Sequence, residues 1–119
     1  MHEYNNDSLV KYLIIIEKLY SKNIIKAFQT INRVDFVPNK SQKRAFDDIP
    51  LSIGFGQTIS QPQVVSFMLE LLDAKKGDNV LDIGSGSAYT TALLSEVVGN
   101  DGFVTGLERV ESLVEYGKE

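Results

Sequence analysis

A short glycine-rich segment carries the clearest chemistry in this 119-residue sequence. Gly84, Ser85, Gly86 and Ser87 follow an apolar run at residues 80–83 and precede an apolar pattern typical of a helix. Glycines at such a turn let the backbone come close to a ligand, and the N-terminus of the following helix offers free N–H groups. We therefore expect Gly84, Ser85 and Gly86 to form a ligand-binding loop.

An acid after the next expected strand completes this pattern. Glu108 follows the strand-like residues 103–107 and lies 24 residues after Gly84. An acid at that place in a doubly wound fold hydrogen-bonds the hydroxyls of a ribose. The loop and Glu108 together predict an adenosine-type cofactor at the carboxyl ends of two parallel strands. The alternative is that the glycines only form a tight turn and that Glu108 is a solvated charge.

The details of the loop favour S-adenosylmethionine as the cofactor. A dinucleotide fingerprint has a third glycine three residues after the second, where this sequence has Tyr89, so a nicotinamide or flavin is disfavoured. The lysine of a P-loop is also absent. Asp82, just before the loop, suits the sulfonium and ammonium cations of S-adenosylmethionine better than it suits a phosphate.

The elements that must position these residues alternate between strand and helix. Residues 80–83 and 103–107 predict strands, and residues 87–98 and 110–116 predict helices. This order predicts a parallel sheet with a crossover helix. Because two parallel strands do not make a stable sheet core, we expect the domain to be truncated here, with further strands on a longer chain or on a partner chain.

The residues before this sheet read as mostly helical. Apolar spacing predicts a helix through Tyr20, capped by Asp7 or Ser8, a second helix from about residue 23 to 31, and a helical turn at 41–46. Residues 50–59 predict a hairpin or an ordered loop. The domain organisation that we expect is an N-terminal helical segment at 1–49, followed by an α/β unit at 50–119.

A further helix is expected at residues 63–72, with one apolar face formed by Val64, Val65, Met68, Leu69 and Leu72. Ser60 and Gln63 have the spacing of a capping box, with Pro62 in the first turn. One interpretation of Ser60 is therefore that it only starts this helix.

The composition excludes several classes of site. The chain has no cysteine, which excludes disulfides, thiolate metal sites and a cysteine nucleophile. Its single histidine, His2, excludes a histidine-based triad and a metal site with several histidines. The net charge of −4 argues against a nucleic-acid partner. Neither a membrane span nor a signal peptide is recognisable, so we expect a soluble cytoplasmic protein.

Residues 50–62, PLSIGFGQTISQP, form the most specific motif. They resemble the signature of protein-L-isoaspartate O-methyltransferases. Residues 33–38 and 45–48 resemble upstream motifs of that family, while 80–87 and 106–109 resemble its cofactor loop and ribose-binding turn. The resemblance covers nearly the whole chain, but only about the first half of the family's domain. It implies an α/β fold in which N-terminal helices precede the first half of a Rossmann-like methyltransferase sheet.

The resemblance also implies a reaction and a set of site residues. The reaction is methyl transfer from S-adenosylmethionine to the carboxyl group of L-isoaspartyl or D-aspartyl residues, which repairs damaged proteins. Ser60 is implied as the active-site serine, and Gln57, Thr58, Ile59 and Ser60 are implied to lie along the cofactor. A carboxylate is already ionised at pH 7 and needs no general base, so Ser60 would orient it by hydrogen bonding.

Three positions depart from the family pattern. Phe55 stands where histidine is common, Asp82 where glutamate is common, and Ala88 where glycine is usual. Two other hypotheses compete with the repair enzyme. One is a methyltransferase for RNA or a small molecule, against which the motif at 56–62 and the acidic balance argue. The other is an inactive or partner-dependent fragment, whose missing C-terminal half another chain supplies.

Overall fold

The computed structural model describes residues 4–118, so His2 lies outside the described part of the chain. Five α-helices, two short 3-10 helices and four strands are present in these residues. In chain order they are α1 (Asn6–Ile15), α2 (Lys22–Thr30), η1 (Arg33–Phe36), η2 (Asn39–Arg44), β1 (Leu51–Gly54), β2 (Gln57–Ile59), α3 (Pro62–Leu72), β3 (Asn79–Ile83), α4 (Tyr89–Val98), β4 (Phe103–Leu107) and α5 (Glu111–Lys118).

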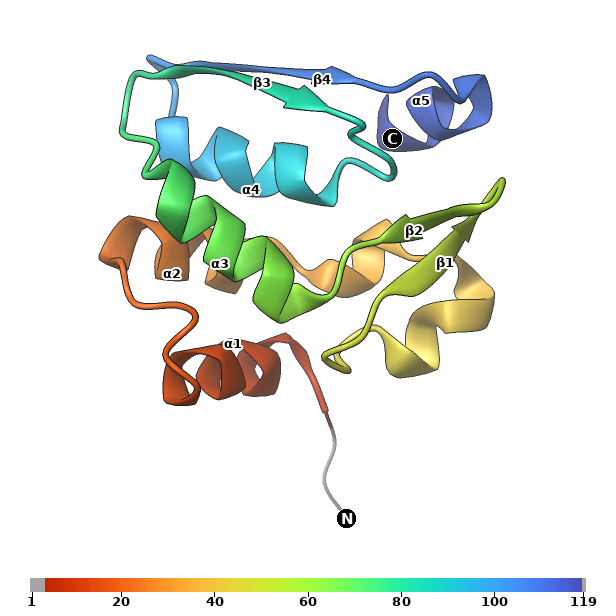
Figure 1. Cartoon of the computed structure of the whole chain (residues 1–119), viewed down its shortest axis with the longest axis horizontal. Helices are drawn as coiled ribbons and strands as arrows, with labels where there is room; N and C mark the ends of the chain where they lie inside the picture. The colour runs from red at the N-terminus through yellow and green to blue at the C-terminus, as the bar shows by residue number, and fades with distance from the viewer. Residues whose placement is uncertain (1–3, 119) are drawn as a thin grey trace.

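Two small sheets organise the chain. Strands β1 and β2 form an antiparallel hairpin, which is one of the two alternatives expected for residues 50–59. Strands β3 and β4 are parallel and in register from Asn79 and Phe103 onward. Helix α4 connects β3 to β4 and covers one face of their sheet (Figure 1). The expected strand–helix–strand order and the expected parallel pairing are confirmed.

The other face of the parallel sheet is apolar and exposed in the described part of the chain. Ile83 is 76% exposed and Phe103 is 66% exposed, and Leu81 and Leu107 are exposed as well. Figure 1 shows no element over this face. Apolar side chains that alternate along both strands are typical of a sheet covered on two sides.

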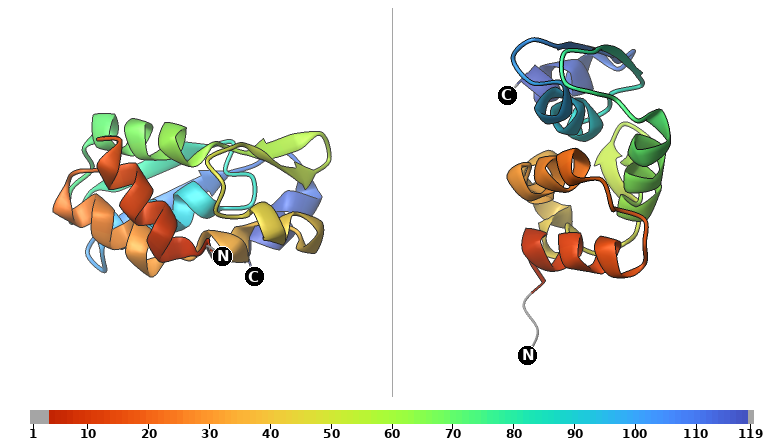
Figure 2. Two further views of the ribbon diagram at one scale, coloured as in Figure 1. Left: turned by 90° about the horizontal axis from the view of Figure 1, so that it is seen from below. Right: turned by 90° about the vertical axis from the view of Figure 1, so that its left-hand side faces the viewer.

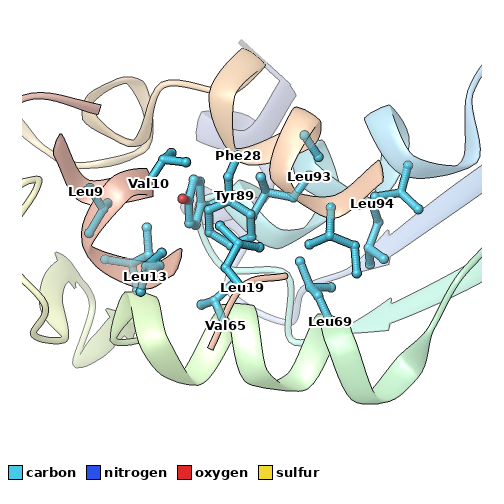
Figure 3. Close-up of a cluster of buried hydrophobic side chains, with 14 of the residues drawn as sticks. Leu9, Val10, Leu13, Leu19, Phe28, Val65, Leu69, Tyr89, Leu93 and Leu94 are labelled. Carbon is cyan, nitrogen blue, oxygen red and sulfur yellow. The ribbon is translucent and has the colours of Figure 1, made fainter. Parts of the chain in front are cut away.

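The hydrophobic core lies between the helices and the covered face of this sheet. Figure 2 shows α4 under the sheet, α2 and α3 below it, and α1 farthest from the sheet. Phe28 and Tyr89 meet edge to face at the centre, with ring centroids 6.3 Å apart (Figure 3). Leu13 and Leu93 are fully buried beside them. This core fixes the helices on which the site is built.

Helix α3 buries a different face from the one expected. Val65 and Leu69 are buried, but Val64, Met68 and Leu72 are exposed, so that prediction is wrong for three of the five residues. The buried face instead includes Ser66 and Glu70. The reason is hydrogen bonding, because the Glu70 carboxylate accepts bonds from the backbone N–H groups at 20 and 21 and from the hydroxyl at 21, where α2 begins.

Helix α1 begins two or three residues earlier than expected and ends sooner. Its N-cap is Asn5, whose side chain accepts a hydrogen bond from the Ser8 N–H at 2.9 Å, while the Ser8 hydroxyl accepts one from the Asn5 N–H at 2.8 Å. This capping box replaces the expected cap at Asp7 or Ser8. The helix ends at Ile15, so Tyr20 lies outside it.

None of the helices in residues 4–118 is long and apolar enough to cross a membrane.

Candidate functional site

A cavity of about 410 Å³, called the main cavity below, is lined by residues at the carboxyl ends of the parallel strands and by one residue of the hairpin. Figure 1 shows that the hairpin lies near this end of the sheet. The cavity lining joins three expected site residues, Gln57, Gly84 and Glu108, although they are far apart in the sequence. The remaining lining residues are Ile83, Leu107 and Arg109. The volume is within the range of small-molecule sites, and the carboxyl ends of parallel strands are where ligands bind in open α/β sheets.

The glycine loop bends back against the end of β4. The N–H groups of Gly84 and Ser85 both donate to the Leu107 carbonyl, at 2.7 and 2.9 Å. Gly84 has φ +78° and Gly86 has φ +57°, backbone conformations that favour glycine. A Cβ added at Gly84 would meet no atom within 4 Å, so the backbone faces open space there. The loop is therefore shaped to let a ligand approach its backbone.

Glu108 ties this loop to the start of α5. Its Oε1 accepts a hydrogen bond from the Gly86 N–H at 3.0 Å, and its Oε2 accepts one from the Val110 N–H at 2.8 Å. The hydrogen bond from Val110 is the main cause that lowers the pKa of Glu108 below its usual value. An ionised carboxylate has about four acceptor positions, so lone pairs remain for a ligand hydroxyl.

Asp82 and Ser85 lie beside the main cavity and do not line it. The Asp82 carboxylate accepts a hydrogen bond from the Thr91 hydroxyl at 2.6 Å, which links β3 to α4. Ser85 lines a neighbouring cavity of about 200 Å³ that shares Glu108 with the first. The structure thus brings Gln57, Gly84 and Glu108 together directly, with Ser85 and Gly86 as their neighbours.

The residues of β2 and the turn after it face different surroundings. Gln57 lines the cavity, Thr58 is exposed, and the Ile59 side chain is buried in the hydrophobic core. Only the backbone of Ile59 can therefore face a ligand. Ser60 is exposed, and because it is three residues past Gln57 along an extended segment, it lies within about 10 Å of that residue.

The interpretation of Ser60 as a helix cap is wrong. Helix α3 begins at Pro62, and its N-cap residue is Gln61. The Gln61 side chain makes no hydrogen bond to the first turn of the helix. Asp48 takes that role instead, because its Oδ1 accepts a hydrogen bond from the Gln63 N–H at 2.9 Å and its Oδ2 accepts one from the Gln63 side chain at 2.8 Å. Within residues 4–118 the Ser60 hydroxyl makes no hydrogen bond and is open to a substrate.

Arg33 lies behind the Ser60 turn, and sequence reasoning missed its role. Its side chain is fully buried, and its Nη2 donates to the Ser60 carbonyl at 2.9 Å. Its guanidinium carbon lies 5.0 Å from the centre of the Tyr89 ring. Burial lowers the pKa of Arg33 and raises the pKa of Tyr89 to about 12. The only signal in the sequence is that residue 33 begins a family-like motif.

Two of the departures from the family pattern occupy left-handed backbone. Ala88 has φ +75° at the N-cap of α4, which explains why glycine is usual there. Its Cβ faces α5, since a Cβ added at Gly117 would lie 3.2 Å from it. Ala88 therefore does not line the main cavity. Phe55, at φ +58°, forms the exposed tip of the hairpin.

The residues around the main cavity fit an adenosine-bearing cofactor. Ile83 and Leu107 offer apolar walls for a ring, Glu108 offers acceptors for sugar hydroxyls, and Gly84 leaves its backbone accessible. Apart from Arg109, which lines the cavity, no cationic side chain is among the lining residues. This set suits a cofactor without phosphates.

Comparisons with known proteins agree with this geometry. The family model described as Protein-L-isoaspartate(D-aspartate) O-methyltransferase (PCMT) matches residues 4–119. A protein-L-isoaspartate O-methyltransferase of Thermosipho melanesiensis is 50% identical over 93 residues, which are 78% of this chain and 47% of the relative. Another, from Ignicoccus hospitalis, is 38% identical over 117 residues, which are 98% of this chain and 56% of the relative.

Solved structures show the same likeness. A PCMT structure from Plasmodium falciparum, in complex with S-adenosyl-L-homocysteine, matches with a TM-score of 0.87 and 27% identity over 98% of this chain and 54% of that one. A second protein-L-isoaspartate O-methyltransferase matches with a TM-score of 0.84 and 31% identity, over 95% of this chain and 37% of that one.

The chain spans about half the length of the relatives that it matches. Its mixed α/β fold and its order of elements are those of the matched half. With a family model matched over almost all of its residues, this chain belongs to the protein-L-isoaspartate(D-aspartate) O-methyltransferase family.

Proposed function

We propose that this chain carries the S-adenosylmethionine bed and the active-site turn of an enzyme that methylates L-isoaspartyl and D-aspartyl residues. Damaged cytoplasmic proteins are the proposed substrates. The observation that carries the proposal is the cavity that joins Gln57, Gly84 and Glu108, with the exposed Ser60 three residues beyond Gln57. Family membership supports the same cofactor and the same class of substrate.

Each of these residues has a defined task in the proposed reaction. S-adenosylmethionine supplies an electrophilic methyl group when it is bound. Glu108 accepts hydrogen bonds from the ribose hydroxyls, and Gly84 lets the backbone contact the cofactor. The Ser60 hydroxyl donates a hydrogen bond to the isoaspartyl carboxylate and fixes the angle at which its oxygen attacks. Such alignment can supply several kcal/mol of the barrier reduction.

Methylation of matched peptides tests this proposal. We expect methyl incorporation into an isoaspartyl peptide and none into the same peptide with a normal aspartyl residue. Equal labelling of both peptides, or labelling of neither by a chain of full family length, would contradict the substrate assignment. A methyltransferase for another substrate class would give that negative result.

Replacing Ser60 tests its catalytic role. In a chain of full family length, Ser60→Ala should lower kcat at least tenfold, about 1.4 kcal/mol in the barrier, and should lower the affinity for S-adenosylhomocysteine less than it lowers kcat. Ser95→Ala is the matched control, because Ser95 is exposed on α4, away from the cavity. An unchanged kcat in Ser60→Ala would remove Ser60 from the reaction.

A second candidate function is that of a fragment that depends on a partner for activity. The exposed apolar face of the β3–β4 sheet favours it, because such a face is normally covered. In this version, the rest of the family's domain supplies the missing strands, in a longer chain or from another chain. Calorimetry with S-adenosylhomocysteine separates the two candidates. A dependent fragment would fail to bind the ligand as it is and would bind it once extended to the family's full length, whereas a chain that carries a complete cofactor bed would bind it in both forms.

A further inference from the structure

The turn that carries Ser60 is held from behind by residues that the proposed reaction does not use. Arg33, in η1, donates from one guanidinium nitrogen, Nη2, to two carbonyl oxygens. These are the carbonyls of Ser60, at 2.9 Å, and of Ile49, at 3.4 Å. The two carbonyls lie on either side of the β1–β2 hairpin, so this one nitrogen joins the start and the end of the hairpin segment.

Asp48 holds the residues that follow Ser60 in the same turn. Its carboxylate accepts hydrogen bonds from the backbone N–H and from the side-chain amide of Gln63. Its backbone carbonyl accepts a hydrogen bond from the Gln61 side chain at 3.0 Å. Arg33 and Asp48, which lie 12 or more positions earlier, therefore hold the turn at the Ser60 carbonyl and at Gln61 and Gln63. The Ser60 side chain itself stays exposed.

Arginine is not the side chain that would stabilise the fold most at position 33. The Arg33 side chain is 0% exposed, and its Nε and Nη1 atoms have no hydrogen-bond partner within residues 4–118. No salt bridge in that part of the chain includes it. The Tyr89 side chain, two carbonyls and the nearby negative charge of Asp48 offset part of the cost of burying its charge. Because a buried charge with free donors is costly, an apolar side chain would fill this space at lower cost.

We propose that Arg33 is a positioning residue, which together with Asp48 holds the Ser60 turn where the hydroxyl meets the substrate carboxylate. This inference rests on the proposed function of Ser60 and deepens it. A displacement of about 1 Å at a reacting group can cost about 100-fold in rate, so a rigid support behind Ser60 has a direct kinetic consequence. The cofactor cavity does not include Arg33, so cofactor binding should not depend on it.

The test uses Arg33→Met, which fills the space without donors, and Arg33→Lys, which keeps the charge on a single donor nitrogen. Glu70→Gln is the matched control, since it also weakens hydrogen bonds of a buried charged side chain, but at the start of α2. Hydrogen exchange is followed in each variant for the α2 amides and for the amides at 60–63, which are those of Ser60, Gln61 and Gln63 because Pro62 has no N–H. S-adenosylhomocysteine affinity and the kcat and KM for an isoaspartyl peptide are measured alongside.

In Arg33→Met we expect exchange at 60–63 to accelerate at least tenfold while the α2 amides keep their rates. The expected kcat is at least tenfold lower, with S-adenosylhomocysteine affinity within about threefold of the original, and Arg33→Lys should recover part of both losses. Glu70→Gln should show the opposite exchange pattern and an unchanged kcat.

Two results would overturn the positioning role. One is unchanged exchange at 60–63 in Arg33→Met, and the other is faster exchange everywhere together with weaker cofactor binding, which marks a general structural role. If the unaltered protein methylates no isoaspartyl peptide, the proposed function fails. The exchange rates at 60–63 still decide, in that case, whether Arg33 holds the turn.

Discussion

Replacing Gly84 by alanine tests the glycine loop, and Gly77 provides a matched control. Gly84 has φ +78° and Gly77 has φ +89°, and a Cβ at either position would meet no atom within 4 Å. Each substitution therefore places an alanine in left-handed backbone without a clash, at a cost of about 1–2 kcal/mol in folding free energy. For a chain of this size that is a fall in Tm of roughly 3–8 °C.

Only Gly84 lines the main cavity, so the two variants should differ in ligand binding. We expect Gly84→Ala to weaken S-adenosylhomocysteine at least tenfold, about 1.4 kcal/mol, because its methyl group occupies space that the ligand needs. Gly77→Ala should bind as the unaltered chain does. Calorimetric titration and thermal unfolding measure both effects. Equal affinity in the two variants, at equal loss of stability, would refute the placement of the cofactor against Gly84.

Three further substitutions test other contacts. Glu108→Ala should weaken S-adenosylhomocysteine by roughly 1–3 kcal/mol in calorimetry, the scale of a charged hydrogen bond, and unchanged affinity would exclude Glu108 from the site. Because its folded-state pKa is lowered, the stability that Glu108 contributes is present above its unfolded-state pKa and is lost as pH falls through the folded-state pKa. Acid unfolding of the unaltered chain should therefore show a loss that Glu108→Ala lacks. Ala88→Gly should raise stability by about 1 kcal/mol in thermal unfolding, since Ala88 has φ +75°, and a lower Tm would show that its contact with α5 matters more. Glu70→Gln should destabilise the fold by roughly 1.5–3 kcal/mol in urea titration, because the carboxylate accepts three hydrogen bonds at the start of α2, and no change would refute its capping role.

The sequence predicted the elements whose signals are local. Gly54 and Gly56 marked the hairpin, and apolar runs bounded by turns marked β3 and β4. The glycine loop and Glu108 were expected to meet because parallel strands end at one edge of a sheet. Periodicity, turn residues and strand direction decide all three features over short stretches of chain.

Contacts between distant residues were beyond sequence reasoning. The Ser60–Gln63 spacing fits a capping box, but Asp48 bonds Gln63 and excludes it. The apolar period of α3 fits two faces, and the choice between them depends on Glu70 meeting the start of α2. The burial of Arg33 likewise follows from packing against Tyr89, which no spacing rule encodes.

A crystal structure with bound S-adenosylhomocysteine tests most directly whether the main cavity holds the cofactor with its sulfur near Ser60. We expect the ribose hydroxyls within hydrogen-bond distance of Glu108, the ligand in contact with the backbone of Gly84, and the sulfur on the side of Ser60. A ligand bound elsewhere, or a sulfur that faces away from the Ser60 turn, would contradict this placement.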